Sequence, residues 1–130
     1  MKTVKVVAAI IRANKRILAT QRGYGEFAGG WEFPGGKVEP GEQPEQALAR
    51  EIREELATSV IIDRRVISVV YEYPTFILNM DCFLCELAGG SPQLLEHSAA
   101  RWLDADHLYD VEWLPADEGV LRAIKDQGIV

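Results

Sequence analysis

The chain has 130 residues, 48% of them hydrophobic, which is enough to bury one core but too few for two domains of ordinary size. Fourteen basic against 20 acidic residues give a net charge of −6, which argues against binding to a nucleic-acid polymer or to a membrane surface. The apolar run from Val6 to Ile11 ends at Arg12, and no segment is long enough to span a bilayer. We therefore expect a single domain over residues 1–130, in the cytoplasm.

The N-terminal segment predicts a β-hairpin. Val4 to Ile11 is rich in β-branched residues, Asn14-Lys15 marks a turn, and Arg16 to Arg22 supplies the second strand. Four glycines follow between Gly23 and Gly30. This composition suits a mobile flap over a pocket as well as it suits a plain connection.

A helix is predicted from about Pro44 to Ala57. The run Trp31 to Lys37 before it is strand-like but broken by Pro and two glycines, so its backbone can bend sharply and approach a ligand. Pro44 suits a first helical turn because it has no amide hydrogen to leave unpaired. Leu48, Ile52 and Leu56 form the apolar stripe that should face a core.

Three glutamates of this helix share one face, because Glu51, Glu54 and Glu55 occupy positions i, i+3 and i+4. Glu55 should project beside the apolar stripe and Glu51 a little farther round, so both would be half-buried. Like charges at this spacing destabilise an isolated helix by roughly 0.2 to 0.5 kcal/mol per pair. Either full solvation or a bound divalent cation would offset the repulsion, and the helix by itself leaves both open.

The second half of the chain predicts further strands and a final helix. Strands are expected near Val60 to Tyr73, Phe76 to Glu86 and Arg101 to Leu103, one helical turn over Asp104 to Tyr109, and an amphipathic helix over Ala116 to Asp126 with Val120, Leu121 and Ile124 inward. Strands placed between helices predict an α/β fold with a mixed sheet flanked by helices.

The cysteines and histidines are expected to be structural. Cys82 and Cys85 form a Cys-x-x-Cys pair, but within a strand this spacing puts the two side chains on opposite faces, and no second pair completes a zinc site. Two reduced, buried cysteines are the simpler interpretation. His97 and His107 are isolated in the sequence, which argues against a metal or general-base role for either.

The glutamate helix and the segment before it resemble the signature of the Nudix hydrolases. The matching positions are Gly36, five residues, Glu42, seven residues, Arg50-Glu51-Ile52, one residue and Glu54-Glu55. Gly35-Gly36-Lys37 is similar to the MutT-like branch. Ala57 replaces the usual glycine and disfavours a left-handed turn at the helix end, and Thr58 replaces an aliphatic residue.

Looser similarity covers most of the chain, and the group that it resembles best is the (deoxy)nucleoside triphosphate pyrophosphohydrolases, including CTP pyrophosphohydrolases. The resemblance implies the Nudix α/β/α sandwich with a mixed β-sheet. It also implies a divalent cation, Mg²⁺ or Mn²⁺, which suits hard carboxylate ligands. The ligands would be the Gly35 carbonyl with Glu51, Glu54, Glu55 and Glu96.

The same resemblance assigns roles to single residues. The catalytic set is Glu51, Glu54 and Glu55, with Glu51 the candidate for orienting or deprotonating the water. Arg50 would pair with Glu42 and hold the ligands in register. Lys37 and Arg22 would lie near the triphosphate. Glu96 is also compatible with a solvated loop position.

Asp117 is the candidate for base recognition, because the corresponding place in MutT-like proteins faces the base. An ionised carboxylate only accepts hydrogen bonds, which suits the amino group of cytosine or adenine. A plain N-terminal helix acid is the alternative. Trp31, Phe33 and Tyr73 could stack on a base or belong to the core.

The leading hypothesis is Mg²⁺-dependent hydrolysis of a (deoxy)nucleoside triphosphate such as CTP or dCTP to the monophosphate and pyrophosphate. Alternatives are an 8-oxo-dGTP diphosphatase, a dinucleotide or nucleotide-sugar pyrophosphatase, and a non-catalytic nucleotide-binding module. An intact set of repelling glutamates argues against the last, because a module without chemistry would gain by losing them. The sequence gives no indication of the oligomeric state.

Overall fold

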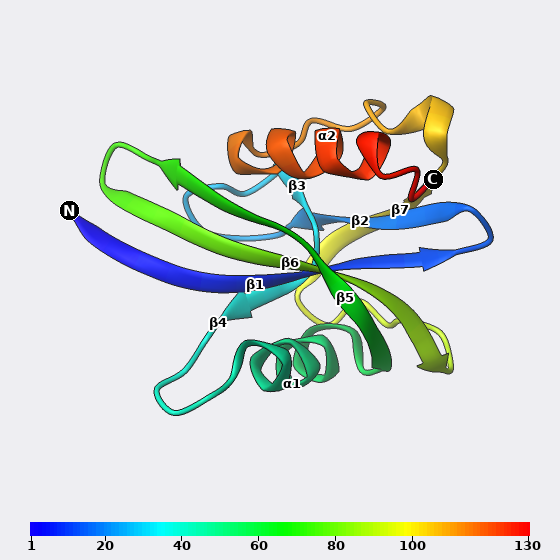
Figure 1. Ribbon diagram of the computed structural model, residues 1–130, viewed down its shortest axis with the longest axis horizontal. Helices are drawn as coiled ribbons and strands as arrows, with labels where there is room; N and C mark the ends of the chain where they lie inside the picture. The colour runs from blue at the N-terminus through cyan, green and yellow to red at the C-terminus, as the bar shows by residue number, and fades with distance from the viewer.

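The computed structural model describes all 130 residues as a twisted mixed sheet with one long helix on each side (Figure 1). The strands are β1 (Lys2–Ala13), β2 (Arg16–Arg22), β3 (Trp31–Glu32), β4 (Gly35–Lys37), β5 (Ser59–Glu72), β6 (Phe76–Gly89) and β7 (His97–Leu103). The helices are α1 (Pro44–Leu56) and α2 (Glu118–Asp126), with 3₁₀ turns at Ala105–His107 and Pro115–Asp117. This arrangement confirms the predicted α/β/α sandwich.

Strand β1 is the centre of the sheet. The main path runs β3-β2-β1-β6-β5, with β4 also paired to β1 and β7 to β2. The β1–β6 pair is parallel over Lys2 to Ile11, while β1–β4 and β1–β2 are antiparallel. The β1–β2 turn uses Asn14 and Lys15, both at positive φ, as a hairpin with a two-residue turn requires.

The two faces of the sheet carry two cores. Side chains alternate along a strand, so even-numbered residues of β1 such as Ala8 and Ile10 face α2, while Val7 and Ala9 face α1. The α2 core includes Val120, Leu121 and Ile124, and the α1 core includes Leu48, Ile52 and Leu56, as their periodicity predicts.

The two cysteines lie on opposite faces of β6, as their spacing predicts. Cys82 belongs to the α2 core and Cys85 to the α1 core, and both thiols are free. Burial raises the pKa of Cys82 well above its usual range and that of Cys85 to about 12. Burial thus favours the neutral thiol at both positions.

The end of α1 departs from expectation. Ala57 adopts the left-handed conformation that its side chain disfavours, with φ 51° and ψ 37°, and its N–H donates to the carbonyl of Arg53. Hydrogen bonding and the docking of Leu56 in the core hold this turn against a local cost of roughly 1 to 2 kcal/mol. The cap forms without glycine.

Other boundaries shift modestly. Strand β7 begins at His97, four residues before the predicted Arg101, because it pairs with β2 from Ile17 to Arg22. The residues before Glu118 form a 3₁₀ turn instead of the first turn of α2. None of the helices combines the length and apolarity needed to cross a lipid bilayer.

Candidate active site

The glycines before α1 bring the backbone of β4 against two neighbours. A Cβ on Gly36 would lie 2.3 Å from the carboxyl carbon of Glu51, and one on Gly35 would lie 2.0 Å from the carbonyl oxygen of Val7. At Gly35 the clash is with backbone atoms, so only glycine fits there, while a side chain at Gly36 would displace the Glu51 carboxylate. The strand thereby runs directly beside the glutamate face of α1.

Arg50 ties the loop and the helix together. Its Nε and Nη2 donate to the two oxygens of Glu42 at 2.8 and 2.9 Å, which confirms the predicted pair, and Nη2 also donates to the Lys37 carbonyl. Its Nη1 donates to Glu51 at 2.9 Å and to Glu54 at 3.2 Å. The bidentate contact lowers the pKa of Glu42 to about 2.

Glu55 is the most buried of the acidic side chains on this face, only 10% exposed. Its Oε2 accepts a hydrogen bond from the Gly35 N–H at 3.3 Å. Burial, followed by the charges of Glu51 and Glu32, raises the pKa of Glu55 to about 8. Burial also raises the pKa of Glu51, although Arg50 opposes this shift.

The predicted metal ligands gather around one end of α1 and the backbone of β4. Glu96 precedes β7 and lines a cavity of about 30 Å³ together with Glu55. The Glu54 side chain is 57% exposed and turned to Arg50. As the side chains stand, no three acidic, histidine or cysteine groups are arranged to hold a metal ion.

The donor set nevertheless fits a hard divalent cation. All the side chains in it are carboxylates, and two of them are substantially buried. Burial, with added repulsion from neighbouring glutamates, raises the pKa of both Glu51 and Glu55. A cation would offset the repulsion that Arg50 relieves only in part.

Two residues of this region were not predicted from the sequence. Glu32, at the end of β3, accepts from Arg22 Nη2 at 3.0 Å. His97 is not isolated as predicted, because its Nε2 lies 3.5 Å from Glu32 and 3.9 Å from Glu55. Its position directly after Glu96 was the only signal in the sequence.

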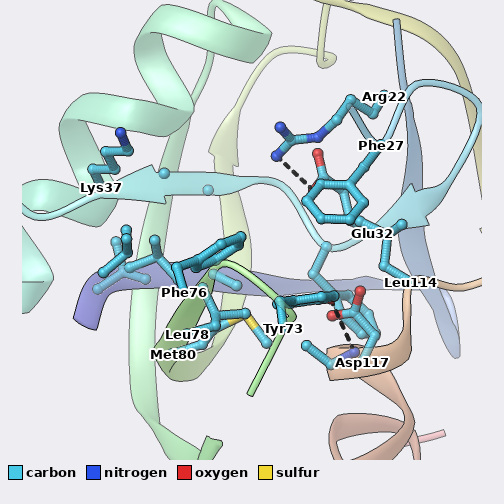
Figure 2. Close-up of a pocket in the computed structure, with 18 residues that line it drawn as sticks. Arg22, Phe27, Glu32, Lys37, Tyr73, Phe76, Leu78, Met80, Leu114 and Asp117 are labelled. Atoms are coloured by element: carbon cyan, nitrogen blue, oxygen red, sulfur yellow. Dashed lines mark hydrogen bonds and ion pairs between the residues drawn. The ribbon is translucent and has the colours of Figure 1, made fainter. Parts of the chain in front are cut away.

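A pocket of about 210 Å³ opens on the α2 face of the sheet, next to the glutamate cluster. Gly35, Gly36 and Lys37 of β4 line it, and Lys37 and Asp117 lie at opposite ends (Figure 2). Its other lining residues are mostly apolar and include Val4, Val6, Phe27, Phe33, Tyr73, Phe76, Leu78, Met80 and Leu114. The dimensions suit a single planar base rather than two.

Aromatic rings form much of the pocket wall. Phe27, from the glycine-rich loop, packs against Tyr73 with ring centroids 5.1 Å apart, and Tyr73 stacks on Phe76 at the same separation (Figure 2). Phe33 and Tyr73 line the pocket and also belong to the hydrophobic core, since each is less than a tenth exposed. Trp31 does not line the pocket.

The two predicted phosphate-binding cations differ in their surroundings. Lys37 is exposed and lies near the glutamate side of the pocket (Figure 2). Arg22 is ion-paired with Glu32 and lines both the pocket and the small cavity beside Glu55. Each is placed where it could contact a phosphate chain running from the pocket to α1.

Asp117 is buried in the pocket wall at 3% exposure. Burial, with a smaller contribution from Glu32, raises the pKa of this carboxyl well above its usual range. A neutral carboxyl offers one hydrogen-bond donor and one acceptor, where the ionised form offers acceptors only.

Comparison with known proteins identifies the family. The family model described as the NUDIX domain matches residues 1–124, and the chain belongs to this family of hydrolases. A CTP pyrophosphohydrolase of Escherichia coli is 39% identical over 124 residues, which are 95% of this chain and 92% of that protein.

Two further matches agree with this assignment. A protein of Mycobacterium tuberculosis named as a putative 8-oxo-dGTP diphosphatase 2 is 37% identical over 92% of this chain and 85% of its own length. The solution structure of the E. coli ORF135 protein superposes with a TM-score of 0.84 at 37% identity, covering 98% of this chain and 92% of that one. The chain is thus a MutT-like Nudix enzyme.

Proposed function

We propose that this enzyme hydrolyses a free (deoxy)nucleoside triphosphate to the monophosphate and pyrophosphate, with CTP or dCTP as the preferred substrate. The observation that carries the proposal is that two sites meet at Gly35 and Gly36. One side of these glycines holds the glutamate cluster, and the other holds an aromatic pocket that ends in a buried carboxyl. A nucleotide with its base in the pocket directs its phosphates toward α1.

Bound Mg²⁺ or Mn²⁺ would supply charge stabilisation at the phosphate oxygens and lower the pKa of the attacking water. Glu51, Glu54, Glu55 and the Gly35 carbonyl would hold the cation, with Glu96 reaching it or its water. Release of Glu51 and Glu54 from Arg50 would turn their carboxylates toward the cation.

The roles of the remaining side chains follow from their positions. Glu51 packs against Gly36 and would orient or deprotonate the water. Lys37 and Arg22 would contact the triphosphate. Arg50 would keep α1 and β4 in register through Glu42 and the Lys37 carbonyl.

The burial of Asp117, which raises its pKa and favours the neutral carboxyl, points to cytosine. A neutral carboxyl can donate to the ring nitrogen N3 of cytosine while its other oxygen accepts from the amino group. The ionised form, which has acceptors only, matches the two adjacent N–H donors of a guanine edge. The raised pKa of Asp117 favours the first arrangement.

An 8-oxo-dGTP diphosphatase is the second candidate, and the name of the M. tuberculosis relative favours it. The same catalytic residues would serve, with Asp117 ionised. A dinucleotide or nucleotide sugar is less suited, because a pocket of about 210 Å³ holds one base. A non-catalytic module would not be expected to retain the buried, mutually repelling glutamates. As part of the same proposal, the enzyme would act on free nucleotides as a single domain in the cytoplasm, without a nucleic-acid partner.

A substrate panel tests the proposal. The purified protein is incubated with Mg²⁺ and each of CTP, dCTP, UTP, dTTP, dGTP and 8-oxo-dGTP, and the release of pyrophosphate and of orthophosphate is measured. We expect pyrophosphate, with the highest kcat/KM for a cytosine nucleotide. Higher kcat/KM for 8-oxo-dGTP than for every cytosine nucleotide would favour the second candidate, and release of orthophosphate alone would contradict the proposed reaction.

A further inference from the structure

His97 lies where three strands and a helix meet. It starts β7 and pairs with Arg22 of β2 next to an irregularity in the register. The side chain is only 5% exposed. Its Nε2 lies between two carboxylates, 3.5 Å from Glu32 Oε2 and 3.9 Å from Glu55 Oε2, while its Nδ1 is buried without a hydrogen-bond partner.

The geometry favours the tautomer of His97 that is protonated at Nε2. Two carboxylate oxygens face Nε2, and a bare nitrogen there would repel both, so Nε2 carries the hydrogen. The distances to Glu32 and Glu55 are longer than a formed hydrogen bond, and a movement of less than 1 Å would complete either one. Hydrogen bonds of this kind often tighten only when substrate is bound.

The contacts of Glu55 distinguish its two oxygens. Both the Gly35 N–H and His97 Nε2 approach Oε2, so Oε1 is left for a cation. Glu32, on the other side of the imidazole, is neutralised by Arg22, whose Nη2 donates to Oε1 of Glu32 at 3.0 Å. Arg22, Glu32, His97 and Glu55 thus form a row that ends on the glutamate face of α1.

We propose that His97 is a positioning residue, whose Nε2–H holds the Oε2 atom of Glu55 so that the Oε1 atom is presented to the catalytic cation. The proposal rests on the proposed function for the identity of the ligand. His97 lies outside the glutamate motif of α1, so the proposal adds a new residue to the metal site. Metal-binding carboxylates are commonly oriented in this way by a donor on the oxygen that does not bind the metal.

A purely structural role accounts less well for the histidine. Burial of a polar nitrogen without a partner destabilises a fold, so packing alone would favour Leu at this place. A hydrogen bond from Nε2 to Glu55 requires a polar side chain at position 97. This requirement explains why the free-energy cost of the unpaired Nδ1 is tolerated.

Three substitutions separate these roles. His97→Gln can place an amide N–H near the position of Nε2, His97→Asn has its amide nearer to Nδ1, and His97→Leu keeps bulk without any donor. The matched control is His107→Leu, because His107 is exposed and contacts only Asp104. For each protein, Mn²⁺ affinity is measured by calorimetry without nucleotide, and kcat, KM and the Mg²⁺ concentration for half-maximal rate are measured with CTP.

We expect His97→Leu to bind Mn²⁺ about 10- to 100-fold more weakly and to need correspondingly more Mg²⁺, with thermal stability equal to or above that of the wild type. The KM for CTP at saturating Mg²⁺ should change less than threefold. His97→Gln should recover most of the Mn²⁺ affinity, and His107→Leu should match the wild type.

Wild-type Mn²⁺ affinity in a folded His97→Leu protein would overturn the proposal. If that variant does not fold, His97→Gln and His97→Asn decide the matter, because equal Mn²⁺ affinities for the two would exclude a specific role of Nε2. Failure of the proposed function gives a different result, namely a wild-type protein that binds Mn²⁺ but releases no pyrophosphate from any nucleotide.

Discussion

The two faces of the sheet use the same strands for opposite chemistry. On the α1 face, residues beside Gly36 present buried carboxylates whose charges are only partly balanced. On the α2 face, a pocket of about 210 Å³ is lined with aromatic and aliphatic side chains, and Asp117 is its buried carboxyl. Strand alternation directs most of the side chains of the two environments to opposite faces.

The difference suggests that reaction and specificity reside in separate sets of residues. Changes on the α1 face should abolish turnover for every nucleotide alike. Changes at the far end of the α2 pocket should alter the choice of base and leave the chemistry intact. Arg22 and Glu32, which line both cavities, are where this separation is weakest.

The largest effect is expected from the glutamates of α1. Glu55→Gln and Glu54→Gln should each lower kcat by several hundredfold, about 3 kcal/mol or more in barrier, because a charge that holds the cation is lost at constant volume. The loss should be equal for all nucleotides. Steady-state assays at saturating Mg²⁺ check this, with Glu45→Gln, an exposed residue of the same helix, as the control. Retention of more than about a tenth of wild-type kcat would show that the substituted residue is not an essential ligand.

A smaller and selective effect is expected at Asp117. Asp117→Leu should lower kcat/KM for CTP or dCTP by about 1 to 3 kcal/mol, because it removes both the donor and the acceptor of the carboxyl, whereas Asp117→Asn, whose amide keeps one donor and one acceptor, should retain most of that kcat/KM. Competition between CTP and 8-oxo-dGTP measures the change in preference directly. Equal losses in the two variants would mean that Asp117 only supports the start of α2.

The pH dependence of the same ratio sharpens this test. Asp117 has a raised pKa, so its neutral form prevails below that pKa and its ionised form above it. The preference for CTP over 8-oxo-dGTP should therefore fall as pH rises. A ratio of two substrates at each pH cancels any titration at the glutamate cluster. In Asp117→Asn the ratio should be independent of pH.

Replacement of the two cysteines tests whether each face of the sheet also contains residues with a purely structural role. Replacing Cys82 and Cys85 together by Ala should lower the free energy of unfolding by about 1 kcal/mol or more, because one buried side chain is truncated in each core. Metal dependence and turnover of the folded protein should not change. Denaturant unfolding and zinc analysis provide the measurement, and a stoichiometric zinc lost in the variant would contradict the prediction.

The smallest effect is expected at the end of α1. Ala57→Gly should stabilise the fold by about 0.5 to 1 kcal/mol, because glycine removes the penalty of the left-handed conformation. The greater conformational entropy of glycine in the unfolded chain offsets only part of this gain. Ala47→Gly, inside the same helix, should be destabilising instead. Urea unfolding of the two variants gives the comparison, and a loss of stability in Ala57→Gly would show that the turn is not strained.

The α1 face could be predicted from the sequence in most of its parts. Periodicity placed Leu48, Ile52 and Leu56 in the core, and the spacing of the glutamates placed Glu55 beside them. Helical geometry is local, so a fixed spacing determines which side chains share a face. The Glu42–Arg50 pair joins the loop to the helix, and it followed from the family resemblance.

The α2 pocket was much less predictable. Tyr73 and Phe76 flank the single turn between β5 and β6, but Phe27 comes from a distant loop, and only the tertiary fold packs it against them. His97 was judged isolated because its partners, Glu32 and Glu55, are distant in the chain. Contacts made through tertiary structure leave no spacing to detect.

The parallel pairing of β1 with β6 also bears on how the protein folds. The first strand contacts β2 over only a short stretch, while its ten-residue ladder with β6 joins segments more than 70 positions apart. Such a ladder closes a long loop before it gains any contact, which slows folding. A chain emerging from the ribosome would therefore expose the apolar β1 until β6 had been synthesised. We expect β1 to be the segment that recruits a chaperone.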